Sequence, residues 1–391
     1  MAAETLDQLL TNVSLFSIAN VTSFNQESID RLPLHPWVSG HPWVGLDIGG
    51  ANLKAAHSAG WSHSMGFPMW KQSRKLAVSV AQLLDACPAF CGVAVTMTGE
   101  LADCFATRAE GVAVILEQLT SILPSELVRV YGVDGSWKSV VQSAREPWSV
   151  AASNWHGLAR FVTRLAGQRS CLLIDVGSTT TDLIPIRNGC IAMEAQTDSQ
   201  RLQTGALVYT GVERSNVAGI VRELTLFGVP CPVMNEQFAT MKDVYLWLRD
   251  LPDEPSNCDT ADGKPATRES ARFRLSRMVG EDGSTLTDSD VDALAREIAT
   301  AQSAMLVNAI RQLSKGPTTR KSRAKKSALQ HCDFECVVIS GHGEFLAESA
   351  LAECGWDGER ILLGETLGPE LSRCAPAYAI ATLAAEEFCV D

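Results

Sequence analysis

Leu-Asp-Ile-Gly-Gly-Ala-Asn at 46–52 and Ile-Asp-Val-Gly-Ser-Thr-Thr at 174–180 are two versions of one pattern. In each, an apolar run carries an aspartate two residues before a glycine, then enters a bend of small or polar residues and continues as a second apolar run. This order predicts a β-hairpin with Asp47 or Asp175 at the end of its first strand. The spacing between the copies is too long for a solenoid repeat and indicates duplication of a whole domain.

Each bend can turn several backbone N–H groups and hydroxyls toward one anion. An aspartate at the adjoining strand end can hold Mg²⁺, usually through water, or position a nucleophile. Asp47 and Asp175 are therefore candidate catalytic residues and candidate ligands of Mg²⁺. The candidate phosphate-binding residues of the bends are Gly49, Gly50, Asn52, Gly177, Ser178, Thr179 and Thr180.

A third turn, Ser-Gly-His-Gly-Glu at 340–344, follows the apolar run Cys-Val-Val-Ile. Glycines there allow a base or a phosphate to approach a helix N-terminus closely, so Gly341 and Gly343 are further binding candidates. His342 is expected to line the site through its backbone rather than as a catalytic imidazole. The turn lacks the third glycine of a dinucleotide fingerprint, and the sequence contains no P-loop pattern.

These stretches resemble known families. LDIGGANLKAA, LIDVGSTTTDLI and ISGHGEFLA resemble the two phosphate motifs and the adenosine motif of the actin/hexokinase/heat-shock ATPase superfamily. GSTTTD, GALVYTGVERSNV and MTGELADCFATRAEGV are similar to the hydantoinase A/oxoprolinase family. Within that family, ANLKAA, TGELADCF and NWHGLAR most resemble the methanofuran-biosynthesis transferases and their bacterial homologues linked to tetrahydromethanopterin one-carbon metabolism. The resemblance covers about residues 43–388.

The resemblance implies an α/β, actin-like (ribonuclease H-like) duplicated two-domain fold with a cleft between the domains. We expect the first domain at 41–168, completed by a C-terminal helix at 376–391, and the second at 169–375. Residues 1–40 form an extension of unassigned role. The stretch KGPTTRKSRAKK at 315–326 carries six basic residues in twelve and is expected to be a solvated loop. Periodicity predicts a long helix at 288–313.

Composition narrows the class of protein. The chain has 391 residues, 46% of them hydrophobic, and a net charge of −12, so neither nucleic acid nor an anionic membrane is the expected partner. No apolar run is long enough to span a bilayer, and the N-terminus lacks the features of a signal peptide, which favours the cytoplasm. The twelve cysteines are scattered, several within apolar runs such as those around Cys171 and Cys336, as expected of buried thiols in a reducing compartment.

The resemblance implies a transferase that condenses an aminomethyl-furan-methyl diphosphate with the phenol of a γ-glutamyl tyramine or tyrosine and releases diphosphate. Its partner is a small phosphorylated molecule, with Mg²⁺ as cofactor; ATP binding and a homodimer remain open. Two other classes compete: an ATP-dependent amide hydrolase of the hydantoinase or oxoprolinase kind, and a non-catalytic nucleotide-binding scaffold of the actin kind.

Individual side chains have two interpretations each. Glu100, just past an apolar run, is the preferred general base, or else a first-turn acid of a helix. Asp182 is a catalytic acid or a turn residue. Lys54 contacts phosphate or points to solvent. Asn154 and Trp155 are candidate contacts for an aromatic substrate, with Trp155 alternatively part of the core.

Overall fold

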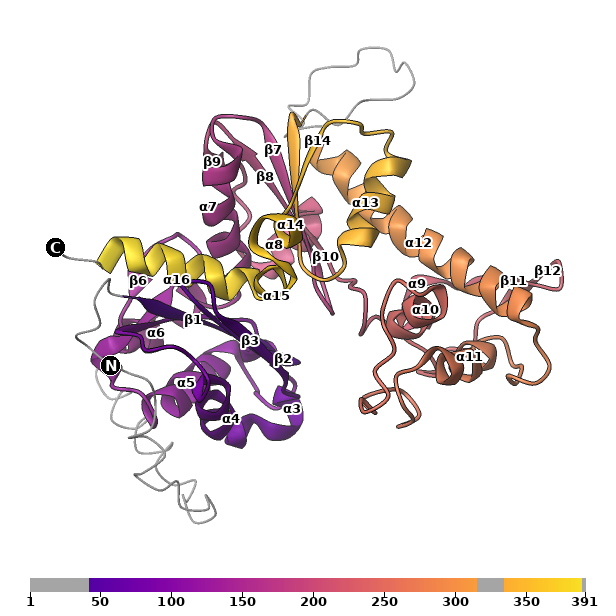
Figure 1. Ribbon diagram of the computed structural model, residues 1–391, viewed down its shortest axis with the longest axis horizontal. Coiled ribbons are helices and arrows are strands. Elements are labelled where there is room, and N and C mark those ends of the chain that lie inside the picture. Colours follow the sequence, from indigo (N-terminus) through magenta and orange to yellow (C-terminus); the bar gives the residue numbers. More distant parts are fainter. Residues whose placement is uncertain (1–41, 315–333, 389–391) are drawn as a thin grey trace, which may run out of the picture.

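The computed structural model describes residues 42–314 and 334–388, so the predicted extension at 1–40 and basic loop at 315–326 lie outside the described residues. Two mixed sheets make up its centre (Figure 1). The first contains β1 (Trp43–Ile48), β2 (Asn52–His57), β3 (Ser62–Gly66), β4 (Gly92–Met97), β5 (Val128–Tyr131) and β6 (Trp137–Lys138). The second contains β7 (Cys171–Val176), β8 (Thr181–Arg187), β9 (Cys190–Ile191), β10 (Leu207–Val208), β13 (Cys336–Ser340) and β14 (Glu359–Leu362).

Both sheets have the same topology. Their orders are β3-β2-β1-β4-β5-β6 and β10-β8-β7-β13-β14, with β9 beside β8. In each, the first strand pairs antiparallel with its hairpin partner and parallel with a strand that returns after a helix. All six residues of β1 are buried, as is typical of a central strand covered on both faces. The duplication predicted from the paired hairpins and the ribonuclease H-like fold implied by the resemblance are both confirmed.

Two helices lie between the sheets. α7 (Asn154–Ala166) packs on β7, β8, β9 and β13 of the second sheet, whereas α16 (Ala375–Phe388) packs on β1, β2 and β4 of the first. The two helices also pack against each other (Figure 1). α16 therefore covers the first sheet, as we expect of a helix that completes the first domain. α7 falls within residues 41–168 of the chain but covers the second sheet. The division of the chain into domains at 41–168 and 169–375 is therefore kept as a proposal.

The outer faces carry further helices. α4 (Leu76–Leu84) and α5 (Arg108–Thr120) contribute to the core of the first sheet, and α13 (Glu344–Glu353) and part of α12 (Asp288–Ser314) to that of the second. The long helix predicted at 288–313 is thus present. The connecting helices are α3 (Met69–Gln72), α6 (Val140–Arg145), α8 (Asp198–Thr204), α14 (Leu363–Leu367) and α15 (Pro369–Arg373). Short 3₁₀ turns span Ser73–Lys75, Gly99–Leu101, Ser125–Leu127 and Pro147–Ser149.

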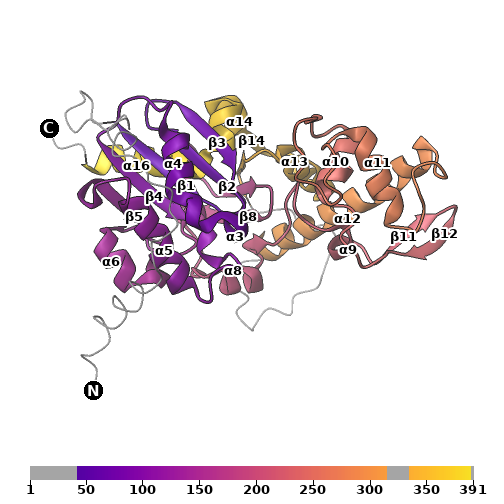
Figure 2. The same cartoon turned by 90° about the horizontal axis from the view of Figure 1, so that it is seen from below.

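A lobe inserted into the second half was not predicted from the sequence. It comprises α9 (Val217–Ile220), β11 (Glu223–Leu226), β12 (Val229–Pro232), α10 (Met241–Leu248) and α11 (Arg268–Arg277). These elements gather around the far part of α12 and stand clear of the first sheet (Figure 2). Arg274 lies at its centre, fully buried, and its guanidinium binds Asp243 at 2.6 Å and Asp262 at 3.0 Å. The lobe therefore has a polar anchor as well as an apolar core.

Two further sequence expectations concern the membrane and the thiols. Within residues 42–314 and 334–388, no helix has the length and apolarity needed to cross a bilayer. The thiols of Cys171 and Cys336 are buried side by side on the paired strands β7 and β13, as predicted, and burial raises the pKa of Cys171.

The fit of α16 on β1 generates a stability prediction. A Cβ atom at Gly45 would overlap the carbonyl oxygen of Ala377 in α16. We expect Gly45→Ala to lower the free energy of unfolding by about 1–3 kcal/mol, the usual cost of overpacking a core. Urea titration monitored by circular dichroism measures this change. Gly219→Ala is the matched control, because a Cβ there meets no atom within 4 Å; equal stability of the two variants would contradict the argument.

Candidate active site

The two predicted bends adopt the same geometry and meet. The N–H of Gly49 donates to the carbonyl oxygen of Asn52 at 3.0 Å, and the N–H of Gly177 donates to that of Thr180 at 2.9 Å. The Asn52 amide then donates to the Ser178 hydroxyl at 3.4 Å, which joins the bend of one sheet to the bend of the other. Polar groups of both halves therefore face one shared space, which is the arrangement that an anion held from two sides requires.

The third turn packs directly on the second hairpin. Gly341 has a φ of +89°, and a Cβ there would overlap the carbonyl oxygen of Val176 and lie 3.1 Å from Oδ1 of Asp175. The N–H of Gly343 donates to the Val176 carbonyl at 3.2 Å. Only glycine fits at position 341, because the backbone conformation and the close approach both exclude a side chain.

Three carboxylates and one ammonium group cluster where these strands end. Asp47 lies opposite Lys54 in the β1–β2 pair, and Asp175 lies opposite Asp182 in the β7–β8 pair. Burial raises the pKa of Asp47 and of Asp175; the charge of Lys54 opposes both shifts, and repulsion from Asp182 and Asp47, respectively, adds to them. Lys54 thus acts on both aspartates and does not simply point to solvent. Ser340, the partner of Asp175 in the β7–β13 pair, also opposes the rise in the pKa of Asp175, whereas Oδ1 of the buried Asp47 has no hydrogen-bond partner among the described residues.

This cluster suits a divalent cation that is bound by one or two carboxylates and takes its remaining ligands from waters and phosphate oxygens. No three His, Cys, Asp or Glu side chains of residues 42–314 and 334–388 form a ready-made coordination group. Mg²⁺ commonly uses one or two carboxylates together with waters and phosphate oxygens, so it does not need a complete cage of side chains. The unpartnered oxygen of Asp47, facing the other acids, is the kind of group such an ion would satisfy.

A cavity of about 1310 Å³ opens beside the bends. Of the predicted residues, those in its wall are Gly50, Asn52, Asn154, Ser178, Thr179, Thr180 and Asp182. Those outside its wall are Asp47, Gly49, Lys54, Glu100, Trp155, Asp175, Gly177, Gly341 and Gly343. The polar bend residues thus form the surface that a ligand would meet, and the coupled aspartates of β1 and β7 stand behind it.

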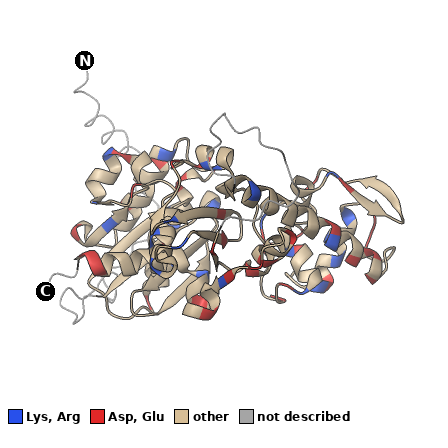
Figure 3. Cartoon of the chain, turned by 90° about the horizontal axis from the view of Figure 1, so that it is seen from above, with Lys and Arg blue, Asp and Glu red and all other residues tan. Residues whose placement is uncertain are grey.

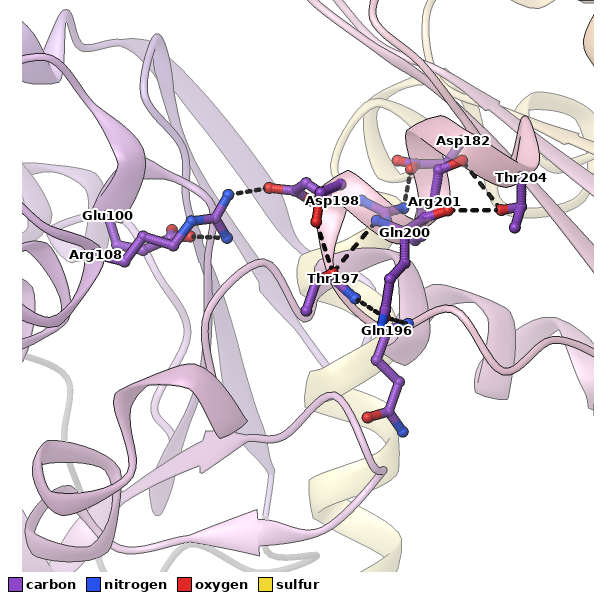
Figure 4. A network of polar contacts seen from close by, with 10 residues as sticks. Glu100, Arg108, Asp182, Gln196, Thr197, Asp198, Gln200, Arg201 and Thr204 are labelled. Atoms are coloured by element: carbon purple, nitrogen blue, oxygen red, sulfur yellow. Dashed lines mark hydrogen bonds and ion pairs between the residues drawn. The ribbon is translucent and has the colours of Figure 1, made fainter.

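A chain of charged side chains runs from Glu100 to Asp182 and joins the two halves (Figure 4). Nη1 of Arg108, in α5, lies 3.3 Å from Oε1 of Glu100, and its other amino group pairs with Asp198 in α8. Asp198 also binds Nη2 of Arg201 at 3.0 Å, and Arg201 pairs with Asp182 on β8. Acids and arginines alternate in this series of contacts, so Asp198 lies between Arg108 and Arg201.

Burial sets the acidity of the two ends of this chain. Glu100 is only 1% exposed, and desolvation raises its pKa to about 7, against the opposing charge of Arg108. Desolvation raises the pKa of Asp182 to about 6, although Arg201 lowers it. Carboxyl groups that titrate near neutral pH can exchange protons with a substrate, so both ends are suited to general acid–base chemistry.

Trp155 is the predicted substrate contact that the geometry supports least. It is 2% exposed, lies outside the cavity wall, and packs in the core between α7 and the second sheet. The guanidinium carbon of Arg201 lies 4.8 Å from its ring centre. Trp155 therefore supports the charged chain by a cation–π contact, whereas its neighbour Asn154 does reach the cavity.

Sequence reasoning missed the part of the wall that the inserted lobe contributes. Nε2 of His342 lies 2.8 Å from Oε1 of Glu213, and Nζ of Lys242 lies 2.9 Å from Oε2 of the same residue. Burial alone would raise the pKa of Glu213, but His342 and Lys242 lower it below its ordinary value. The imidazole of His342 therefore has a specific partner in Glu213. Both signs of charge occur in the cavity wall, for example at Lys71 and Asp103, and both are spread over the two halves of the chain (Figure 3).

Comparison with known proteins places the chain in a family. The family model described as hydantoinase/oxoprolinase matches residues 92–387. The (4-{4-[2-(gamma-L-glutamylamino)ethyl]phenoxymethyl}furan-2-yl)methanamine synthase of Methanocaldococcus jannaschii is 33% identical over 343 residues, which are 87% of this chain and 96% of that protein. The protein of the same name from Methanococcus vannielii is 28% identical over 222 residues, covering 56% of this chain and 93% of its own length.

Among solved structures, component A of (R)-2-hydroxyglutaryl-CoA dehydratase from Acidaminococcus fermentans is 12% identical with a TM-score of 0.40, covering 88% of this chain and 98% of that one. The family assignment rests on the sequence matches. The family model extends from β4 to α16 and includes the second hairpin and the third turn, but not the first hairpin. This chain belongs to the hydantoinase/oxoprolinase family.

Proposed function

We propose that the protein is a transferase that joins an aminomethyl-furan-methyl diphosphate to the phenol of a γ-glutamyl tyramine or tyrosine and releases diphosphate. The product is a phenoxymethyl furan, the type of molecule for which the relatives from Methanocaldococcus and Methanococcus are named. The structural observation that carries the proposal is the contact of Asn52 with Ser178, which combines two anion-binding bends beside one cavity. The reaction would serve the biosynthesis of a methanofuran-type C1 carrier.

As the bond between carbon and the diphosphate oxygen breaks, negative charge builds up on the departing diphosphate. The protein must stabilise this charge. The bend residues in the wall, Asn52, Ser178, Thr179 and Thr180, offer hydroxyl, amide and backbone donors that are already in place. Donors that need no reorganisation at the moment of reaction lower the barrier most effectively. When bound near Asp47 and Asp175, Mg²⁺ supplies further positive charge for the same oxygens.

The other half of the reaction is attack by the phenol. The bond between the furfuryl carbon and the diphosphate oxygen breaks, its electron pair leaves with the diphosphate, and the phenol oxygen forms the new bond to that carbon. The phenol proton passes to a carboxylate, for which we propose Glu100, whose Oε2 has no hydrogen-bond partner among the described residues. Leu101 and Ala102, which directly follow Glu100, line the cavity, so only a short distance of chain separates the base from the substrate space.

The decisive test is product analysis. We expect incubation with the furan diphosphate and a γ-glutamyl phenolic amine to yield the ether and one equivalent of diphosphate, measured by mass spectrometry and a diphosphate assay. ATP in place of the furan donor should release no phosphate. Steady ATP hydrolysis stimulated by a cyclic amide, without ether formation, would instead assign the amide hydrolase activity.

The coupled aspartates generate a second prediction. We expect Asp47→Asn and Asp175→Asn each to lower turnover by about 100-fold or more, because each removes charge that holds the cation against the diphosphate. The melting temperature should stay nearly unchanged, since an amide of the same shape relieves the cost of burying a charge. Asp357→Asn is the control, because Asp357 is an exposed aspartate outside the cavity wall. Full activity in either test variant would refute a shared site.

The role of Glu100 as the base gives a pH prediction. A base must be ionised to accept a proton, so kcat/KM should rise with pH through a midpoint near 7, the pKa of Glu100. Glu100→Gln should remove this limb and lower the rate by about 10²- to 10⁴-fold. Arg108→Gln should move the midpoint to higher pH, because the Arg108 charge lowers the pKa of Glu100.

Arg145→Gln is the matched control, since it removes an equal charge from an exposed position outside the cavity wall. Its midpoint should equal that of the unchanged protein. Asp182, with a pKa of about 6, is the competing base. A midpoint near 6 that survives Glu100→Gln and disappears in Asp182→Asn would transfer the role to Asp182.

A further inference from the structure

A cation–π pair spans the two halves of the cavity wall. The guanidinium carbon of Arg214 lies 4.3 Å from the ring centre of Trp70. Trp70 belongs to α3, which follows the first hairpin, whereas Arg214 lies in the loop that follows β10 of the second sheet. Both residues line the cavity together with the two bends. Neither has a role in the active site described so far.

Each partner of the pair is attached to one bend. The N–H of Met69, next to Trp70, donates to the carbonyl oxygen of Gly50 at 2.9 Å, and the N–H of Arg214 donates to that of Ser178 at 2.9 Å. The loop that carries Arg214 is pressed against the second bend, because a Cβ at Gly211 would overlap the Gly177 carbonyl oxygen. The pair is therefore held at a fixed place relative to both bends by backbone hydrogen bonds.

Arg214 differs from Arg201 and Lys242 of this wall in having charge to offer, as do Lys71 and Arg373, which also line the cavity and have no partner acid among the described residues. Arg201 is neutralised by Asp182 and Asp198, and Lys242 by Glu213. Among the residues that the structure describes, Arg214 makes no ion pair, and it is exposed to the cavity side. Stacking on Trp70 uses the flat face of the guanidinium and leaves the N–H groups at its edge available, the edge that matches phosphate oxygens in a two-point contact.

We propose that Arg214 binds a phosphate group of the diphosphate chain held by the two bends, and that Trp70 positions its guanidinium. The identity of that chain as an organic diphosphate rests on the proposed function; the shared chemistry is a polyphosphate chain, which ATP also carries. Because Trp70 comes from the first half and Arg214 from the second, the contact forms only when the two halves are together. Arg214 thereby adds a cationic donor to the neutral hydroxyl, amide and N–H groups of the two bends.

Calorimetric titration of the full chain with inorganic diphosphate, in the presence of Mg²⁺, tests this assignment. We expect Arg214→Gln to weaken binding by about 10- to 100-fold, the range for a lost charge-assisted hydrogen bond. The affinity of Arg214→Lys for diphosphate should lie between those of the unchanged protein and Arg214→Gln, because lysine keeps the charge but lacks the planar guanidinium edge. Trp70→Leu should weaken binding about 3- to 10-fold, and combining it with Arg214→Gln should add nothing, because Trp70 acts through Arg214.

Arg222→Gln is the matched control: it removes the same charge from an exposed position outside the cavity wall and should bind as the unchanged protein does. Unaltered binding by Arg214→Gln, with its melting temperature retained, overturns the proposal. If that variant fails to fold, Arg214→Lys decides in the same way. Additive losses in the double variant overturn the positioning role of Trp70.

Titration with ATP separates this inference from the proposed function. If ATP binds, inorganic diphosphate does not, and Arg214→Gln weakens ATP binding, Arg214 is a phosphate contact and the transferase proposal fails. If diphosphate binding depends on Arg214 but no ether forms from the furan donor, the outcome is the same. If the unchanged protein binds neither ligand, the inference is overturned.

Discussion

The hydrogen bond between Asn52 and Ser178 requires two bends from separate sheets to approach within one side-chain length. That approach explains much of the surrounding packing. α7 and α16 lie crossed between the sheets and set their separation, and Gly45 allows α16 to lie directly on β1. Gly211 and Gly341 bring other segments against the second hairpin in the same way. Close-packed interiors transmit such constraints, because a misplaced methylene cannot be absorbed locally.

The electrostatics of the site follow from burying many acids in the same region. Burying an ionised carboxylate without a partner costs free energy. Burial accordingly raises the pKa of four acids in this region, Asp47, Asp175, Asp182 and Glu100. Arg108 and Arg201 compensate part of that cost while joining the halves through Asp198. A bound cation would offset part of the remaining negative charge of these acids.

Local pattern was enough to predict the two hairpins, their duplication and the helix at 288–313, because hairpins and helices are determined by neighbours in sequence. The ribonuclease H-like fold followed from the resemblance and not from local pattern. The orientation of Lys54 was also within reach, since the hairpin register places it opposite Asp47. The ion pair of Arg108 with Asp198 and the contact of His342 with Glu213 join residues about 90 and 130 positions apart, and no local signal reports them. The inserted lobe was missed for the same reason: its short elements are interpretable only around α12.

The placement of α16 has a consequence for how the chain folds during synthesis. β1 leaves the ribosome well before the helix that covers its face, because α16 is translated more than three hundred residues later. Domains usually fold as units in the order of synthesis. Here the first half exposes the backbone at Gly45 and the apolar side of its sheet until the second half has emerged. It completes its folding only when α16 packs on β1. During that period of synthesis the exposed apolar surface of the first half is prone to aggregation. Chaperones would therefore bind mainly to this half of the nascent chain.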